Sequence, residues 1–386
     1  MPNPDRPART WLSRLKLTGF RNYPSLALSL DLEPRPVVLT GPNGAGKTNL
    51  LEAISFLAPG RGLRGAALDE VARHGGDGTW AVAVTVEAAG GAVDLGTGVA
   101  MTPDGPEKRR TILVNHVPSR SADALLDHLR VVWLTPAMDG LFTGPASERR
   151  RFLDRAVLAI DKSHASRVNA FERAMRGRNK LLAEAAPDAG WLDAIETEMA
   201  ELAVAIAAAR REWAAQIAAL IAEGDHGSAF PFAEMALEGT LEHWLDGHPA
   251  RAAEDLYRAD LAGERPRDAR AGRTLAGPQL SDLRVRHGPR QAAAETCSTG
   301  EQKALLIGLV LAQARLTARL FGATPIVLLD EIAAHLDRTR REALFTVLGE
   351  LGCQAFMTGT DAAIFAPLGE ASQSLVVTEG TVRPAG

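Results

Sequence analysis

The first third of the chain alternates apolar and polar residues, a pattern typical of half-buried β-strands. Two alternating stretches joined at Asn22-Tyr23-Pro24 predict a pair of short strands near the start of the chain. Three more, interrupted by Gly90-Gly91 and by the basic loop Lys108-Arg109-Arg110, predict an antiparallel meander. The predicted strands are Trp11–Pro24, Ser25–Leu32, Gly78–Ala88, Ala92–Val99 and Thr111–Val114.

The pattern changes to helical spacing from Ser147 onward. In Trp191–Glu223, apolar residues recur every three or four positions, which predicts a heptad seam about four heptads long on a helix of about 50 Å. Ser147–Ala186 can pack back on this helix as an antiparallel hairpin that turns near Pro187-Asp188-Ala189-Gly190. An ordinary helical subdomain and a projecting coiled-coil arm both fit the pattern. Gly224–Asp268 is rich in glycine and proline, and predicts loops and short helices. The seam residues are Leu192, Ile195, Met199, Leu202, Ile206, Trp213, Ile217 and Leu220.

Short, continuously apolar runs on both sides of this helical stretch predict buried strands. Apolar helices are predicted at Leu50–Leu57 and at Ala304–Leu320. The fold class is therefore α/β, with a head that is split in sequence by the helical insertion. The predicted buried strands are Val37–Thr40, Val131–Thr135, Thr324–Leu329 and Gln354–Gly359.

The loop after the first buried strand fits the phosphate-binding pattern GxxxxGK[ST] and runs into an apolar helix. Its glycines let the backbone wrap around a phosphate chain with the amides pointing inward. Lys47 would reach the β- and γ-phosphates, and Thr48 would place its hydroxyl on Mg²⁺. ATP and Mg²⁺ are the expected cofactors. The predicted nucleotide-binding residues of the loop are Gly41, Pro42, Asn43, Gly44, Ala45, Gly46, Lys47 and Thr48.

The run Thr324–Leu329 ends in two carboxylates, Asp330 and Glu331, which is the form of a Walker B strand. Such a strand would bring Asp330 into the Mg²⁺ shell beside Thr48, and Glu331 would polarise water for attack on the γ-phosphate. Taken alone, the pair also fits a solvated strand end. In the nucleotide interpretation, Lys47 and Glu331 are catalytic, Asp330 binds nucleotide, and Thr48 and Asp330 bind the metal.

The segment Cys297–Lys303 decides between these interpretations. Hydroxyl residues three positions before Glu301 and Gln302 form a capping-box pattern at the start of the apolar helix. Such a helix N-terminus is an anion site. The pattern is similar to the signature loop of ABC-type ATPases, which binds the γ-phosphate held by the other subunit. The resemblance implies nucleotide contacts from Ser298, Gly300 and Gln302.

A phosphate loop and a signature–Walker B pair separated by a helical insertion is the plan of the SMC-like ATPases, and within this class the sequence resembles the RecF family. The resemblance covers nearly the whole chain, and the short insertion favours RecF over relatives with long coiled coils. It implies an ABC-type ATPase head with a mixed sheet, formed by residues 1–135 and 266–386, around a helical insertion at residues 136–265. Four features carry it: LKLTGFRNYPSLALSLD at 15–31; GPNGAGKTNLLEAI at 41–54; PAMDGLFTGPASERRRFLD at 136–154 with FERAMRGRNKLL at 171–182; and CSTGEQK at 297–303 with LLDEIAAHLD at 328–337.

Several positions can be compared with the motifs of this class. Ala333–Asp337 resembles the D-loop, and His335 within it is assigned no catalytic role. The position that a switch histidine occupies in transporters falls at Thr358-Gly359-Thr360 in this sequence. An imidazole that senses the γ-phosphate is therefore absent, which is compatible with slow turnover. Gly277–Leu283 lacks the histidine and arginine of the Gly-Pro-His-Arg-Asp-Asp-Leu run that RecF proteins usually carry.

The resemblance implies an ATP-dependent DNA-binding protein of replication and of recombinational gap repair in the cytoplasm. Such a protein closes as a homodimer on DNA, with slow, DNA-stimulated ATP hydrolysis as the dimerisation switch. RecR, RecO and RecA are the implied partners, with RecA loading and the SOS response as the setting. The alternative is the ATP-binding subunit of an ABC-type membrane transporter, which leaves the helical insertion unexplained.

Composition narrows where DNA can bind. Of 386 residues, 46% are hydrophobic and 23% charged, as in ordinary globular proteins, and the formal charge of -4 confines DNA contacts to local basic patches. Aromatic residues make up only 5%, which favours backbone recognition of duplex or junction DNA over base stacking. Cys297 and Cys353 fit core packing in a reducing cytosol, and neither a signal peptide nor a membrane segment is expected. The predicted DNA contacts are Arg149, Arg150, Arg151, Arg176, Arg178 and Lys180.

Overall fold

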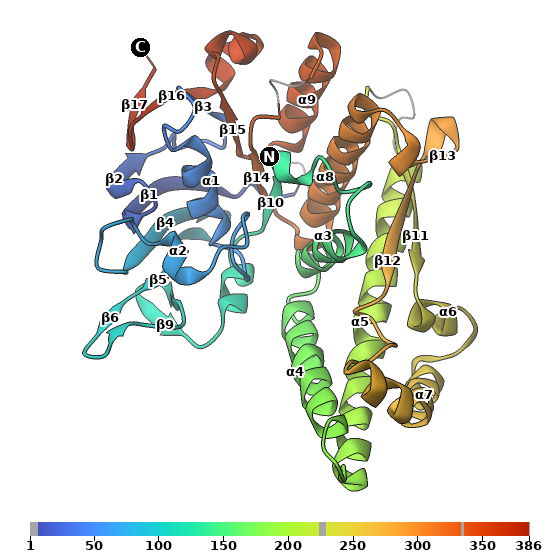
Figure 1. The fold of residues 1–386 in the computed structure, drawn as a ribbon. Helices are drawn as coiled ribbons and strands as arrows, with labels where there is room; N and C mark the ends of the chain where they lie inside the picture. The colour runs from blue at the N-terminus through green and yellow to red at the C-terminus, as the bar shows by residue number, and fades with distance from the viewer. Residues whose placement is uncertain (1–6, 224–228, 333–335, 386) are drawn as a thin grey trace. The chain divides into compact units, whose positions relative to one another are not determined.

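The computed structural model describes residues 7–223, 229–332 and 336–385, which form two compact units (Figure 1). Unit 1 contains Met1–Asp139, Gly227–Phe230 and Leu306–Gly386, and unit 2 contains Gly140–His226 and Pro231–Leu305. The first boundary lies close to the predicted one at 135/136. The second comes after residue 305 instead of 265, because a strand at 282–287 pairs with a strand at 233–238 and so belongs to the inserted unit.

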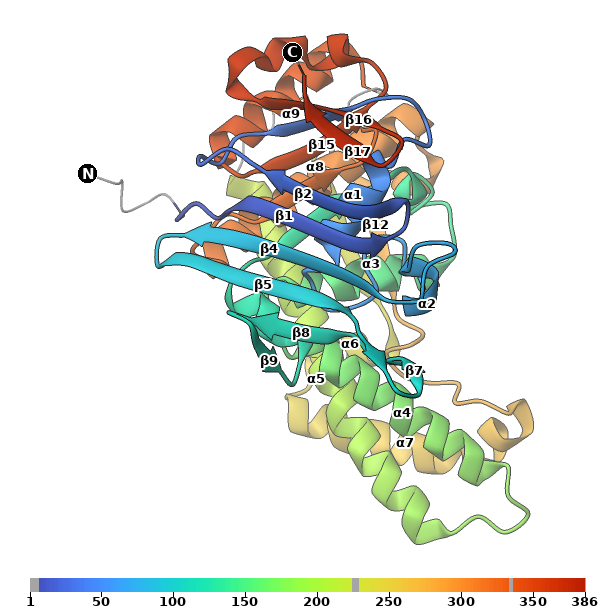
Figure 2. The same ribbon diagram turned by 90° about the vertical axis from the view of Figure 1, so that its left-hand side faces the viewer.

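A six-stranded antiparallel sheet in the order β2-β1-β4-β5-β8-β9 forms one half of unit 1 (Figure 2). On β1, the buried Leu15 and Leu17 alternate with the exposed Arg14 and Lys16, so one face of the sheet packs on the core. The predicted strand pair and meander are confirmed, and they share one sheet. The strands are β1 Trp11–Phe20, β2 Tyr23–Ser29, β4 Trp80–Ala88, β5 Gly91–Val99, β8 Thr111–Val114 and β9 Val117–Ser119, with a separate ribbon of β6 Met101–Thr102 and β7 Gly105–Pro106.

A second sheet of unit 1 has the order β10-β14-β15-β3-β16-β17, and its neighbours are parallel except for the last pair. Strands β3 and β14 are buried at every residue, as their apolar runs predicted. Because the strands are parallel, the carboxyl ends of β3, β14 and β15 meet at one edge. The strands are β3 Val37–Thr40, β10 Val131–Leu134, β14 Ile326–Leu329, β15 Ala355–Gly359, β16 Gln373–Thr378 and β17 Thr381–Pro384.

Helix α1, Lys47–Ser55, joins the two sheets of unit 1. Its fully buried Leu50, Leu51 and Ile54 belong to one hydrophobic cluster that also contains residues of both sheets. Unit 1 also holds α2 Leu68–Val71 and α9 Arg338–Leu351, and α8 Thr299–Phe321 begins in unit 2 and continues into unit 1. Helix α8 is apolar enough to cross a membrane, but 72% of its most apolar window is buried inside the protein. It is therefore a core helix. Short 3₁₀ helices occur at Ala122–Asp127, Pro136–Met138, Gly288–Arg290, Ala294–Thr296 and Ala362–Ala371.

Unit 2 is built around the 35-residue helix α5, Ala189–Glu223. Five of the eight predicted seam residues, Leu192, Met199, Ile206, Trp213 and Ile217, are buried, and the other three, Ile195, Leu202 and Leu220, are half-buried. Because α5 packs against α4, α7 and β11, the structure favours the subdomain over the projecting arm. The other elements of this unit are α3 Ala146–Leu158, α4 His164–Leu182, β11 Ala233–Glu238, α6 Thr240–Gly247, α7 Ala250–Ala271, β12 Asp282–His287 and β13 Ala292–Ala293.

The prediction of loops and short helices before residue 268 is wrong for α7, which is one helix of 22 residues. Ala253, Tyr257 and Leu261 recur at every fourth position, are buried, and join the hydrophobic cluster of α5. Pro266 lies inside the helix, although proline removes a helical hydrogen bond. Burial of the apolar stripe outweighs the lost hydrogen bond. The glycine and proline content of this stretch did not indicate the stripe.

Candidate nucleotide-binding site

The loop between β3 and α1 has a backbone that only glycine accommodates at two positions. Gly41 has φ +147°, and a Cβ there would lie 2.1 Å from the carbonyl oxygen of Val377. Gly46 has φ +113°, and its Cβ would lie 2.5–2.9 Å from the side chains of Asn22 and Tyr23. The loop therefore turns tightly into the N-terminus of α1, as a phosphate-binding loop requires.

The Lys47 side chain folds back into this loop. Its Nζ donates to the carbonyl oxygens of Gly41 at 2.7 Å and Pro42 at 2.9 Å. Burial lowers the pKa of Lys47, and the nearby carboxylates Glu331 and Asp330 act in the opposite direction. The predicted phosphate-binding lysine thus lies inside the loop and close to both predicted Walker B carboxylates.

Side chains of the turn between β1 and β2 donate hydrogen bonds to the phosphate loop, a role that was not predicted from the sequence. Tyr23 Oη donates to the carbonyl of Gly46 at 3.0 Å, and Asn22 Nδ2 donates to that of Ala45 at 3.0 Å. Burial raises the pKa of Tyr23, which keeps its hydroxyl protonated as a donor. Only the position of Asn22-Tyr23 in a predicted turn marked these residues in the sequence.

A buried carboxylate in the middle of α1 holds this helix in place. Glu52 is fully buried and receives two hydrogen bonds from Arg21, from Nε at 2.9 Å and from Nη2 at 2.7 Å. Arg64 Nη1 donates to Glu52 and to Asn49 Oδ1. Two arginines compensate this buried charge, so α1 is held in place immediately after the phosphate loop.

The structure brings together the two predicted Mg²⁺ ligands. Thr48 Oγ1 donates to the Asp330 carboxylate, whose oxygens lie 2.9 and 3.0 Å away. Hydroxyl and carboxylate oxygens are ligands that Mg²⁺ accepts, so the pair fits the expected metal. Glu331 follows with φ +55°, in the left-handed region. Its N–H donates to Thr358 Oγ1 at 2.7 Å, and Thr358 Oγ1 donates to Asp330 Oδ1 at 2.8 Å.

The predicted signature residues lie at the exposed N-terminus of α8, in unit 2. Ser298 and Gly300 are exposed, and a Cβ on Gly300 would meet nothing within 4 Å. The N–H and Oγ of Ser298 both donate to Glu301 Oε2, at 3.0 and 2.9 Å, and these bonds lower the pKa of Glu301. Gln302 is buried and donates to the carbonyl of Cys297 at 2.8 Å, so it supports the loop from inside. Residues 333–335 of the expected D-loop lie outside the described residues.

Comparison with known proteins gives the family. The model of the RecF/RecN/SMC N-terminal domain matches residues 11–381. A protein of Mesorhizobium japonicum (strain LMG 29417 / CECT 9101 / MAFF 303099), described as DNA replication and repair protein RecF, is 56% identical over 98% of this chain and 99% of its own length. The protein of the same description from Rhizobium meliloti (strain 1021) is 54% identical over 97% of this chain and 99% of its own. The chain belongs to the RecF family.

Solved structures agree with the fold. The recombination mediator protein RecF with ATPrS, described as part of the RecFOR pathway, superposes with a TM-score of 0.85 over 99% of this chain and 100% of its own, at 21% identity. An Smc head domain from Pyrococcus furiosus gives a TM-score of 0.53 over 97% and 96%, at 15% identity. The predicted ABC-type ATPase head is confirmed. The transporter alternative is not favoured by a match to RecF relatives over nearly the full length.

The segment Gly277–Leu283, which departs from the usual RecF pattern, is held by three arginines of unit 2, Arg149, Arg150 and Arg210. Arg149 donates from Nε and Nη2 to the two carboxylate oxygens of Asp282, at 2.7 and 2.9 Å. Arg210 Nη1 donates to the carbonyl of Pro278 at 2.7 Å. The hydrogen bonds to Asp282 raise the pKa of Arg149, which is 8% exposed. The prediction that Arg149 contacts DNA is therefore wrong, because its guanidinium is buried and paired.

The same correction applies to Arg178, which is fully buried in unit 2. Its guanidinium donates to Glu196 Oε1 at 2.8 Å, to Asp268 Oδ2 at 2.6 Å, to Thr274 Oγ1 at 3.0 Å and to the carbonyl of Leu261 at 2.7 Å. A guanidinium that uses its donors inside the core has none to offer to a DNA phosphate.

The remaining predicted DNA contacts are open to solvent to different degrees. Arg150 is half-buried and donates to the carbonyl of Ser281 at 2.9 Å, whereas Arg151 is exposed. On α4, Arg176 and Lys180 are exposed, and so is Arg173, which the predicted set omitted. These α4 residues are spaced by three and four positions, so they share one face of the helix.

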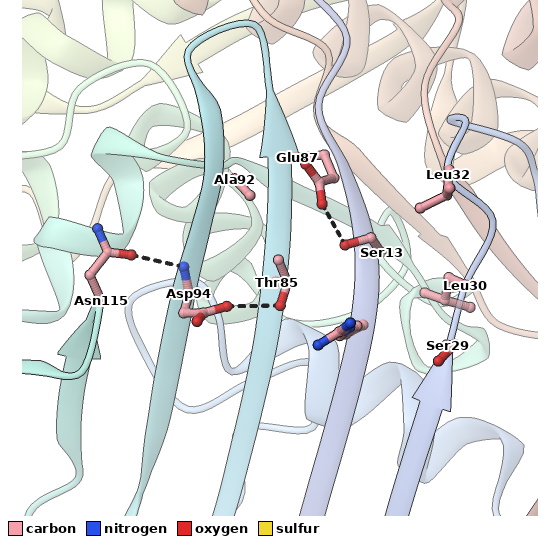
Figure 3. A pocket seen from close by; sticks show the side chains of 10 residues that line it. Ser13, Ser29, Leu30, Leu32, Thr85, Glu87, Ala92, Asp94 and Asn115 are labelled. Atoms are coloured by element: carbon pink, nitrogen blue, oxygen red, sulfur yellow. Dashed lines mark hydrogen bonds between the residues drawn. The ribbon is translucent and has the colours of Figure 1, made fainter.

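A pocket of about 440 Å³ lies on the outward face of the antiparallel sheet in unit 1 (Figure 3). Thr85 donates to Asp94 at 2.8 Å, Ser13 donates to Glu87 at 2.8 Å, and the Asp94 N–H donates to Asn115 Oδ1 at 3.0 Å. No residue of the phosphate loop or the Walker B pair lines it. This pocket is therefore separate from the nucleotide chemistry of the RecF head.

Proposed function

We propose that this RecF family protein binds ATP with Mg²⁺ and uses the nucleotide to close as a homodimer on DNA. The observation that carries the proposal is the contact between Thr48 and Asp330, which are 282 residues apart in the sequence yet share a hydrogen bond. A phosphate loop joined to a Walker B carboxylate in this way is the arrangement that binds a nucleotide triphosphate with its metal.

Each residue of the site receives a role. The loop amides and Lys47 bind the phosphates, and Thr48 and Asp330 hold the Mg²⁺, which neutralises charge on the β- and γ-phosphates when bound. Glu331 orients the attacking water. Ser298 and Gly300 of one subunit contact the γ-phosphate held by the other, which is why the exposed N-terminus of α8 supports a nucleotide-dependent dimer.

The biological setting follows from the family. Relatives over 50% identical across nearly the whole chain are described as DNA replication and repair proteins, and a solved RecF is described as a recombination mediator of the RecFOR pathway. We therefore propose gap repair and replication in the cytoplasm as the role, with RecR and RecO as partners, RecA as the recombinase that is loaded, and the SOS response as its consequence.

The test is a DNA-binding titration at several salt concentrations, with and without ATP. We expect ATP to tighten binding to duplex and junction DNA. The logarithm of the association constant should fall linearly with the logarithm of the salt concentration, because phosphate contacts release counterions. Lys47→Ala removes the cation that the phosphate loop supplies, so it should bind ATP at least about tenfold more weakly and lose the effect of ATP on DNA binding. Glu331→Gln should retain ATP binding and the ATP effect.

Two results would refute the proposal. The first is that the wild-type protein does not bind ATP, which would mean that its phosphate loop serves another purpose. A protein that binds ATP but has the same DNA affinity with and without it is a nucleotide-binding protein whose nucleotide does not control DNA contact.

A further inference from the structure

Thr358 occupies the end of the strand that separates the two nucleotide-binding strands. Strand β15 pairs in parallel with the Walker B strand β14 on one side and with β3, which leads into the phosphate loop, on the other. Thr358 lies opposite Leu39 of β3, and its side chain is fully buried. A hydroxyl buried at this place needs partners inside the protein.

Its partners are the two Walker B residues. Thr358 Oγ1 donates to Oδ1 of Asp330 at 2.8 Å and accepts the N–H of Glu331 at 2.7 Å. A hydroxyl has one proton to donate, so that proton is committed to the Asp330 carboxylate while a lone pair receives the Glu331 amide. The Thr358 side chain thus restrains both the Asp330 carboxylate and the Glu331 backbone.

The backbone of Glu331 requires such a restraint. Its φ of +55° lies in the left-handed region, which residues with a Cβ occupy at an energetic cost and which persists only where the surroundings determine it. The bond from the Glu331 N–H to Thr358 is one such determinant. It restrains the backbone from which the Glu331 side chain projects, two residues after the end of β14.

We propose that Thr358 is a positioning residue for ATP hydrolysis, which holds Asp330 in the orientation that receives Mg²⁺ and directs Glu331 toward the attacking water. The inference rests on the proposed ATPase function of the site. Thr358 acts through the two carboxylates, so its loss should impair the metal-dependent step more than the binding of nucleotide.

The experiment compares Thr358→Val, which keeps the shape and removes the hydroxyl, with Thr358→Ser, which keeps the hydroxyl. The measurements are ATP affinity, the single-turnover rate of hydrolysis at saturating ATP, and the Mg²⁺ concentration that gives half of that rate. Loss of a residue that orients metal ligands lowers activity or metal affinity by about 10- to 100-fold, and we expect an effect of this size in Thr358→Val. ATP affinity should change by less than about threefold, and Thr358→Ser should recover the wild-type values to within about threefold.

Thr97→Val is the matched control. Thr97 is a buried strand threonine of unit 1 whose hydroxyl has no hydrogen-bond partner among the described residues. The Thr97→Val variant should retain the wild-type rate of ATP hydrolysis and the wild-type Mg²⁺ dependence. If Thr358→Val fails to fold by circular dichroism, Thr358→Cys, with a weaker donor, takes its place and should show an intermediate loss.

The outcomes separate the two proposals. Wild-type rate and Mg²⁺ dependence in Thr358→Val or Thr358→Cys would overturn the positioning role, and so would a loss that Thr358→Ser does not recover or that Thr97→Val shares. A wild-type protein that fails to bind ATP would refute the proposed function itself, whatever Thr358 does.

Discussion

Arginine has two distinct uses on helix α4 of this protein. Arg178 directs its guanidinium into unit 2, where Glu196 and Asp268 neutralise it. Arg176, two residues earlier, is exposed and lies 3.5 Å from Glu172. Residue type alone does not distinguish a core ion pair from a surface charge, but the side of the helix does.

Removing the Arg178 guanidinium from its buried network should destabilise the protein strongly. Arg178→Met should lower the free energy of unfolding by about 3–5 kcal/mol, because two buried carboxylates lose a partner. Arg176→Met removes an exposed charge and should change it by less than about 0.5 kcal/mol. Urea denaturation followed by circular dichroism measures both. Equal stability of the two variants would mean that the buried network is not held by Arg178.

At the scale of the element, the outward face of α4 is the strongest candidate for DNA contact. Arg173 and Lys180 form no ion pair among the described residues, and Arg176 lies between them on the same face. Three cations at this spacing along a helix can each meet a phosphate without reading sequence.

Reversing all three charges tests this face. The triple variant with Arg173→Glu, Arg176→Glu and Lys180→Glu should weaken DNA binding by about tenfold or more for unrelated sequences. The slope of log affinity against log salt should fall by roughly two or three phosphate contacts. A control with the same charge change is Arg251→Glu, Arg258→Glu and Arg267→Glu on α7, where each arginine already pairs with an acidic neighbour. If the control weakens binding equally, net charge and not the α4 face is responsible.

The elements of this fold differ in how far the sequence predicted them. The phosphate loop and the strand before Asp330 were predictable because their patterns are local and each residue type has one chemical reason to be there. The seam of α5 was predictable from its period alone. Helix α7 was not, since a proline inside it is tolerated only because Tyr257 and Leu261 bury against another element. Tyr23 was missed as a site residue, and Thr358 was placed only at the switch position without a role for its hydroxyl, because their partners Gly46 and Asp330 are not adjacent in the sequence.

For the whole molecule, the proposed switch is the ATP-dependent dimer. A nucleotide that contacts both subunits must favour the closed pair, and closure must tighten nucleotide binding to the same extent. The exposed N-terminus of α8, with Ser298 and Gly300, is the part of one subunit that can supply the second contact.

Blocking that contact separates ATP binding from closure. In a Glu331→Gln background, Ser298→Arg should leave ATP affinity within about threefold of its parent, because the phosphate loop is intact, and should keep the protein monomeric at saturating ATP. Sedimentation velocity with and without ATP measures the dimer. Dimerisation of the Ser298→Arg protein, or a parent that stays monomeric at saturating ATP, would remove the switch.

The strand order of the parallel sheet also fixes when a newly made chain can complete the candidate nucleotide-binding site. The antiparallel sheet is complete once residue 119 has been made, but β3 needs β15 and β16, and Thr48 needs a partner made 282 residues later. At about 5–20 residues per second, the interval is on the order of tens of seconds. During that time β3 has no partner strand on either side, and its unpaired backbone groups are open to pairing with another chain. A chain truncated before residue 355 lacks both neighbours of β3, and we therefore expect it to aggregate.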